Sequence, residues 1–228
     1  MSLPLRLPTP AVLVITDRHQ AKQPLEEIAA ALFAGGCRWL SLREKDMPAA
    51  ERRALLRRLV ALGKDCGAIV TVHDDLDAAA ALGIGIHLPA QGSVAAARRV
   101  LGATALIGIS AHDATGIAEA AGAGADYATL SPIFLTQSKP GYGPALGLGA
   151  LRGGWPLPVL ALGGIDSGNA TACLEAGAGG VAVMGEAMRV PRPKDFMAEL
   201  LARLPPQLAG SSAPPHSPGT PRNGRASP

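Results

Sequence analysis

The chain has 228 residues, a formal net charge of +3 at pH 7 and 48% hydrophobic side chains, enough apolar material for one large core or two small ones. Aromatic residues make up 3% of the chain and no basic stripe is present, which argues against a nucleic-acid partner. No apolar run is long enough to span a bilayer and residues 1–10 lack a signal-peptide core, so we expect a cytoplasmic protein with no membrane partner; a homo-oligomer is compatible with the composition.

Short apolar runs alternate with helix-like patterns along the chain. The runs predicted as strands are 11–16, 38–42, 68–72, 85–88, 106–110, 127–131, 158–162 and 180–184. Between them lie segments with helical patterns at 25–35, 50–63, 76–83, 94–102, 116–124, 148–154 and 169–179.

This alternation predicts an α/β fold with a parallel sheet. Strands that are apolar on both faces, each followed by an amphipathic helix, are typical of parallel strands covered by helices. Eight such units over 11–204 fit a single (β/α)8 TIM barrel, whereas a doubly wound open sheet would usually carry fewer strands. Residues 205–228 are rich in Pro, Ser and Gly without periodicity, which predicts a disordered C-terminal tail.

Polar residues follow nearly every predicted strand. In a barrel the carboxyl ends of the strands converge on one mouth, where the active sites of this fold are built. Helix capping would account for Asp113, Ser167 and one of Asp74 and Asp75. It does not account for the basic and imidazole side chains at the same ends, which are Arg43, Lys45, His73, His87, His112 and Lys139.

Two glycine-bearing turns indicate a phosphate ligand. Gly163 and Gly164 follow the seventh predicted strand and Gly185 follows the eighth, and loops at these two places in a barrel commonly hold phosphate through backbone N–H groups. A second anionic pocket could form from Arg43, Lys45 and Lys139, although a solvated charge run is the alternative interpretation of residues 43–45.

The motifs REK, HDD, GIHLP, SAH, TQSK, GGI and AGAGGVAVM follow one another over about residues 11–204. In this order and spacing they resemble the thiamine phosphate synthase and thiazole tautomerase (TenI-like) family. The resemblance implies a TIM barrel and a small phosphorylated substrate, a thiazole phosphate held around Gly164 and Gly185. It also implies that Thr136, Ser138 and Lys139 form a loop that contacts the ligand and pyrophosphate.

Two activities share this scaffold by resemblance. A synthase couples hydroxymethylpyrimidine diphosphate to thiazole phosphate with Mg²⁺ and releases pyrophosphate, for which Arg43, Lys45 and Lys139 match the cationic set and Asp74 the first metal-binding aspartate. The chain departs from that pattern by lacking a Gln before REK, by His73 in place of Asn, and by Gly92 in place of the second metal-binding aspartate. The loss of one of two carboxylates weakens a Mg²⁺ site.

The HLP sequence after the fourth predicted strand looks instead like the tautomerase branch, which aromatises a carboxythiazole phosphate by proton transfer and needs no cofactor. His112 is the candidate general acid–base, and a histidine that only orients a loop is the alternative. His87 is expected to be structural, since its sequence neighbours are apolar and a proline follows. We therefore expect a tautomerase, with the synthase as the first alternative and a non-catalytic thiazole-phosphate-binding barrel as the second. The expected site comprises catalytic His112 and Lys139, substrate-binding Arg43, Lys45, His73, Thr136, Ser138, Gly163, Gly164 and Gly185, and, in a synthase only, Asp74 as a Mg²⁺ ligand.

Overall fold

The structure is a computed structural model that describes residues 7–136 and 144–205. Ser138, Lys139 and nearly all of the tail expected at 205–228 lie outside the described residues, so the predicted limits of the domain and the tail stay predictions. Among the helices of the described part, none is both long and apolar enough to cross a membrane.

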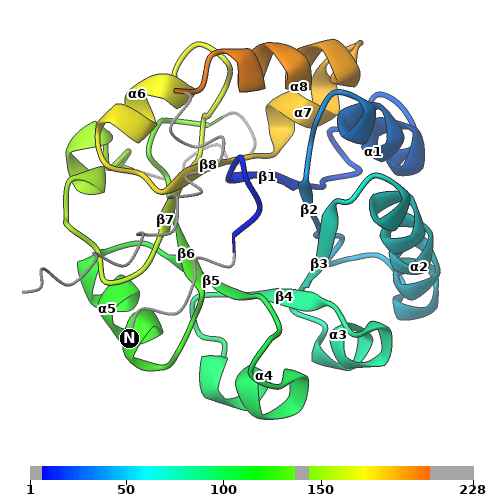
Figure 1. The fold of residues 1–228 in the computed structure, drawn as a ribbon, viewed down its shortest axis with the longest axis horizontal. Helices are drawn as coiled ribbons and strands as arrows, with labels where there is room; N and C mark the ends of the chain where they lie inside the picture. The colour runs from blue at the N-terminus through cyan, green and yellow to red at the C-terminus, as the bar shows by residue number, and fades with distance from the viewer. Residues whose placement is uncertain (1–6, 137–143, 206–228) are drawn as a thin grey trace, which may run out of the picture.

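Eight parallel strands form a closed barrel in chain order, with β8 paired to β1 (Figure 1). This confirms the predicted fold class. The pairing places Val12 beside Val181 and Val14 beside Leu40, so both ends of the sheet meet on β1. The strands are β1 (Val12–Ile15), β2 (Trp39–Leu42), β3 (Ile69–His73), β4 (Gly85–Leu88), β5 (Ile107–Ala111), β6 (Tyr127–Leu130), β7 (Val159–Leu162) and β8 (Gly180–Val183).

Helices surround the barrel on its outer side (Figure 1). Segment 148–154, expected as a helix, forms only the short 3₁₀ helix η1 (Leu148–Leu151), because glycines at 147, 149, 153 and 154 flank and interrupt it. The other helices are α1 (Leu25–Ala34), α2 (Ala49–Asp65), α3 (Leu76–Leu82), α4 (Val94–Leu101), α5 (Ala114–Gly122), α6 (Ala170–Glu175), α7 (Gly185–Arg189) and α8 (Pro193–Ala202).

Capping side chains start three of these helices. Asp113 accepts a hydrogen bond from the N–H of Gly116, as the sequence predicted. Of Asp74 and Asp75, one of which was expected to be a cap, it is Asp75 that accepts a hydrogen bond from the N–H of Ala78. Ser93 begins α4 in the same way. The prediction for Ser167 is wrong: its hydroxyl donates to Glu199 of α8, at 3.2 Å. The side chain that closes that turn is Asp166, which accepts from the N–H groups of residues 168 and 169.

Alternation along each strand separates two cores. Val12 and Val14 pack outward against the helices, whereas Leu13 and Ile15 point into the barrel. Two aromatic side chains pack against each other in the interior: Trp39 of β2 contacts Tyr127 of β6 edge-on, with 4.7 Å between ring centroids. Because β2 and β6 are not neighbours in the sheet, this contact crosses the barrel.

Gly108 of β5 makes room for the Tyr127 ring. The two residues are paired across β5 and β6, and a Cβ added to Gly108 would lie 1.9 Å from the Tyr127 ring. Tyr127 is fully buried, so its ring has no free space into which it can shift. A side chain at position 108 would therefore displace a ring on which the interior packing depends.

We predict that Gly108→Ala lowers the free energy of unfolding by about 1–3 kcal/mol, the usual cost of overpacking a core. Gly122→Ala is the matched control, since Gly122 is exposed at the end of α5 and a Cβ there meets nothing within 4 Å. That control is expected to be neutral or to gain up to ~1 kcal/mol. Urea unfolding of both variants measures the difference, and equal stability would show that the ring is not confined.

Candidate active site

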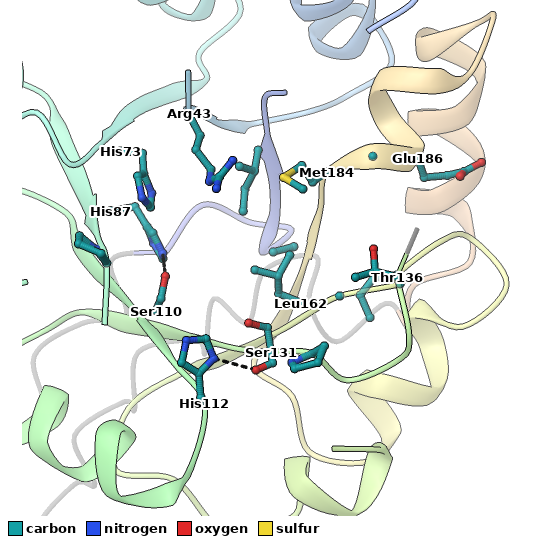
Figure 2. A pocket seen from close by; sticks show the side chains of 18 of the residues that line it. Arg43, His73, His87, Ser110, His112, Ser131, Thr136, Leu162, Met184 and Glu186 are labelled. Atoms are coloured by element: carbon teal, nitrogen blue, oxygen red, sulfur yellow. Dashed lines mark hydrogen bonds between the residues drawn. The ribbon is translucent and has the colours of Figure 1, made fainter. Parts of the chain in front are cut away.

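The carboxyl ends of the strands surround a cavity of about 490 Å³ (Figure 2). Parallel strands in a closed barrel all end at one mouth, so residues far apart in the sequence meet there. Of the residues predicted for the site, the structure brings eight to this cavity: Arg43, Lys45, His73, His112, Thr136, Gly163, Gly164 and Gly185. Asp74 does not line it, and Ser138 and Lys139 lie outside the described residues.

The segment after β2 is not a solvated charge run. Arg43 and Lys45 line the cavity, while Glu44 between them is only 2% exposed. Glu44 accepts hydrogen bonds from the hydroxyl of Thr16 at 2.7 Å and from the N–H of Arg18 at 3.1 Å, and the Thr16 hydroxyl in turn accepts from the N–H of Arg43 at 2.9 Å. These bonds join the carboxyl ends of β1 and β2 and fix the segment from which Arg43 and Lys45 line the cavity. Sequence reasoning missed Glu44, whose buried position nothing in the local pattern shows.

The turn after β7 approaches the β6 loop closely. Gly163 and Gly164 have φ angles of 99° and 64°, in the left-handed region that favours glycine. A Cβ on Gly164 would lie 2.6 Å from the carbonyl oxygen of Leu135. The amide of Asn169 donates to the Gly164 carbonyl at 2.8 Å and holds the turn. The turn therefore presents backbone to the cavity, as a phosphate cradle requires.

His112, at the end of β5, is oriented by a backbone carbonyl. Its Nδ1 lies 2.9 Å from the carbonyl oxygen of Ser131 (Figure 2). Because a carbonyl only accepts, Nδ1 carries the hydrogen in this contact, and the neutral ring has its basic lone pair on Nε2. The side chain is exposed and lines the cavity, so it can accept and return a proton.

His87 contributes to the site in a way that the sequence did not predict. Expected to be structural, it lines the cavity although it is 2% exposed. Its Nδ1 lies 3.0 Å from the Tyr127 hydroxyl and its Nε2 lies 3.0 Å from the Ser110 hydroxyl. Burial, and then the charges of Arg43 and Lys45, lower the pKa of His87 from 6.5 to about 3. The ring is therefore neutral at physiological pH.

The carboxylates at this end of the barrel do not fit a protein-held Mg²⁺. Asp74 is exposed and lies outside the cavity lining. Asp75 is bound to Arg52 and Arg53 at 3.0 and 3.1 Å and caps α3, so its oxygens are already used. A Cβ on Gly92 would lie 2.8 Å from Leu88, so an aspartate would fit there only after a local shift. Over the described residues, no group of three His, Cys, Asp or Glu side chains is placed to hold a metal.

Comparison with known proteins identifies the relatives of this barrel. The family model described as thiamine monophosphate synthase matches residues 12–187. A thiamine-phosphate synthase of Roseiflexus sp. strain RS-1 is 38% identical over 190 residues, 80% of each chain, and one of Methanoculleus marisnigri is 41% identical over 183 residues, 75% of this chain and 84% of its own. The solved thiamine phosphate pyrophosphorylase of Pyrococcus furiosus superposes with a TM-score of 0.78 at 27% identity, over 90% of this chain and 98% of its own.

The neutral state of His87 predicts a pH dependence of stability. Because the folded state disfavours the imidazolium, the unfolded chain binds a proton first, and stability is lost as the pH falls from about 6.5 towards 3. The slope from this one group reaches about 1.4 kcal/mol per pH unit.

Urea unfolding of the wild type and of His87→Gln between about pH 6.5 and 4.5 measures this slope, which the variant should lack. The lowered pKa values of Asp46 and Asp75 add a loss in the same direction only below about pH 4, outside the range tested. A slope that survives in His87→Gln would assign the pH dependence to other groups.

The glycine turn predicts a selective loss of phosphate binding. Gly164→Ala places a methyl group against the Leu135 carbonyl and should weaken the binding of inorganic phosphate at least about tenfold. Gly83→Ala is the matched control: Gly83 has nearly the same φ, 63°, but lies at the end of α3 with nothing within 4 Å of a Cβ. Calorimetry should find phosphate binding unchanged in that variant. Equal weakening in both would trace the loss to backbone strain alone.

Proposed function

The chain belongs to the thiamine monophosphate synthase family, and we propose that it is itself a thiamine-phosphate synthase. The reaction joins hydroxymethylpyrimidine diphosphate to a thiazole phosphate. The bond between the pyrimidine methylene carbon and the diphosphate oxygen breaks, the thiazole nitrogen forms a bond to that carbon, and pyrophosphate leaves. The relatives named above favour this activity over the tautomerase that the sequence motifs favoured.

The observation that carries the proposal is that one cavity is bordered by two regions whose groups suit an anion. Arg43 and Lys45 line the side formed by β2, and the backbone around Gly164 and Gly185 lines the side formed by β7 and β8. In Figure 2, Arg43 and His73 lie on one side of the pocket and Thr136 on the other. A cavity with two such regions suits two phosphorylated substrates better than one.

The proposed coupling reaction requires charge neutralisation at the point where the diphosphate leaves. Negative charge develops on the leaving oxygen as the carbon–oxygen bond breaks, and preorganised cations at that point lower the barrier. Glu44 preorganises them, since its bonds to Thr16 and to the Arg18 N–H hold the segment that carries Arg43 and Lys45. The guanidinium of Arg43 can grip a phosphate through two N–H groups, and Lys45 adds a mobile point charge.

A synthase of this family uses Mg²⁺ by resemblance, but the described side chains do not offer a complete site for it. Of the two expected aspartates only Asp74 is present, and it is exposed and does not line the cavity. A magnesium ion is commonly bound by one or two protein carboxylates together with substrate phosphates. Any Mg²⁺ in this reaction would therefore be held mainly by the diphosphate itself, and the roles given to Arg43 and Lys45 do not depend on it.

The tautomerase is the second candidate, favoured by His112. With its hydrogen on Nδ1, the ring has a basic Nε2 at the cavity wall, which is what removal and return of a carbon-bound proton would need. The glycine at position 92 supports the same activity, because proton transfer needs no metal. A non-catalytic barrel that binds thiazole phosphate is the remaining alternative and would convert neither substrate.

The first test supplies the purified protein with pyrimidine diphosphate, thiazole phosphate and Mg²⁺ and follows thiamine phosphate. We expect turnover, and we expect Arg43→Ala to lower it about 100-fold or more. Arg57→Ala is the matched control, an exposed arginine on α2 whose loss changes the net charge equally and should leave turnover unchanged.

The same protein incubated with carboxythiazole phosphate separates the alternatives. Aromatisation that persists in EDTA and disappears in His112→Gln, together with no thiamine phosphate, would replace the synthase by the tautomerase. Binding of thiazole phosphate without conversion in either assay would make the protein a binding barrel.

A further inference from the structure

His87, Tyr127 and Ser110 form a chain of hydrogen bonds that runs from the barrel interior to the cavity. The Tyr127 hydroxyl lies 3.0 Å from His87 Nδ1. On the other side of the ring, His87 Nε2 lies 3.0 Å from the Ser110 hydroxyl (Figure 2). Tyr127 and His87 are 0% and 2% exposed, whereas Ser110 lines the cavity. A buried phenol is thus linked through one imidazole to a hydroxyl that a ligand can reach.

The direction of the hydrogen bonds follows from the needs of Tyr127. Among the described residues, His87 Nδ1 is the one hydrogen-bond partner of the Tyr127 hydroxyl. A buried O–H without an acceptor is costly, so the hydroxyl donates to Nδ1. A neutral imidazole has one donor and one acceptor nitrogen, which places the ring hydrogen on Nε2. His87 then donates to Ser110, and the serine hydroxyl keeps its own hydrogen for another partner.

The rings around His87 prevent it from reorienting. His73 stacks on it with 5.5 Å between ring centroids and an interplanar angle of 26°. Trp39 packs edge-on against Tyr127, and the Tyr127 ring occupies the space over Gly108. Burial beside Arg43 and Lys45 also keeps the imidazole unprotonated, which excludes a doubly donating ring at neutral pH.

We propose that His87 is a positioning residue: Tyr127 holds it in the Nε2–H tautomer, and it directs the hydroxyl hydrogen of Ser110 into the cavity. Ser110 thereby recognises a hydrogen-bond acceptor on the bound substrate, a ring nitrogen or an oxygen. The donor-to-acceptor direction of these hydrogen bonds does not depend on which reaction the protein catalyses. The use of turnover to detect the contact between Ser110 and the substrate rests on the proposed synthase function.

The tautomer is measured first, on the full-length protein labelled with ¹⁵N-histidine. Long-range ¹H–¹⁵N correlation spectra distinguish the two neutral tautomers, and the His87 signals are assigned by their loss in His87→Gln. We expect a hydrogen on Nε2 and a bare Nδ1 at neutral pH. A hydrogen on Nδ1, or a protonated ring, would overturn the proposal whatever reaction the protein catalyses.

Substitutions then test whether the tautomer matters for recognition. Tyr127→Phe keeps the ring and removes the donor, so the tautomers should mix and the KM of one of the two substrates should rise about tenfold, with a smaller change in kcat. Ser110→Ala should raise the same KM. If Tyr127 acts through Ser110, the double variant should be no worse than Ser110→Ala alone, whereas additive effects would reduce Tyr127 to a packing residue.

Two replacements of His87 provide the matched pair. A glutamine amide can accept from Tyr127 and extend an N–H group towards Ser110, whereas the shorter asparagine can satisfy Tyr127 without reaching Ser110. We expect His87→Gln to raise the KM clearly less than His87→Asn. An equal rise of the KM in both variants would contradict the proposal that His87 links Tyr127 to Ser110. An absence of turnover in the wild type would count against the proposed synthase function. The tautomer measurement alone would then decide whether His87 is a positioning residue.

Discussion

Closure of the parallel sheet through the pairing of β1 with β8 is the constraint on which the rest of the structure depends. The pairing of Val12 with Val181 and of Val14 with Val183 leaves no free edge. It also brings the carboxyl ends of all eight strands to one mouth, because parallel strands share a direction. Residues as distant as Arg43 and Gly185 therefore border one cavity, although no local interaction relates them.

Closure also decides what fills the interior. The inward positions carry Trp39, Tyr127 and His87 as well as aliphatic residues, so the core of the barrel is partly polar. A polar core is stable only if its groups have partners, and the pairing of His87 with Tyr127 meets that requirement below the cavity. The same pairing connects the packing of the barrel to the chemistry of its mouth, because the far side of the imidazole is bonded to Ser110.

The two sides of the cavity are prepared by different means. On the β2 side the buried carboxylate of Glu44 holds the segment that carries Arg43 and Lys45. The entropy lost in ordering this segment is therefore lost on folding and not when a ligand binds. On the β7 side the backbone itself is presented, because Gly164 lies too close to the Leu135 carbonyl for any side chain. In the proposed function both arrangements serve to bind anions, and neither needs a metal ion to be formed.

The sequence by itself determined the barrel and most of its mouth. Strand and helix periodicity is a local property, so the eight strands were predicted within one or two residues, and the polar ends of the strands marked Arg43, Lys45 and His112. The family followed from the order of motifs. Helix capping at Asp113, and at one of Asp74 and Asp75, was equally visible, because a cap acts within three residues of its own position.

Only the tertiary structure decided which of those polar residues serve the cavity. In the sequence Glu44 looks like a surface charge, and only the fold brings Thr16 to its carboxylate. His87 likewise looks like a packing residue, and only the fold brings Tyr127 and Ser110 to its two nitrogens. Asp74, adjacent in sequence to a cavity residue, lies outside the lining. Such outcomes depend on contacts between strands that are 20 to 40 residues apart, and a pattern read along the chain contains no information about them.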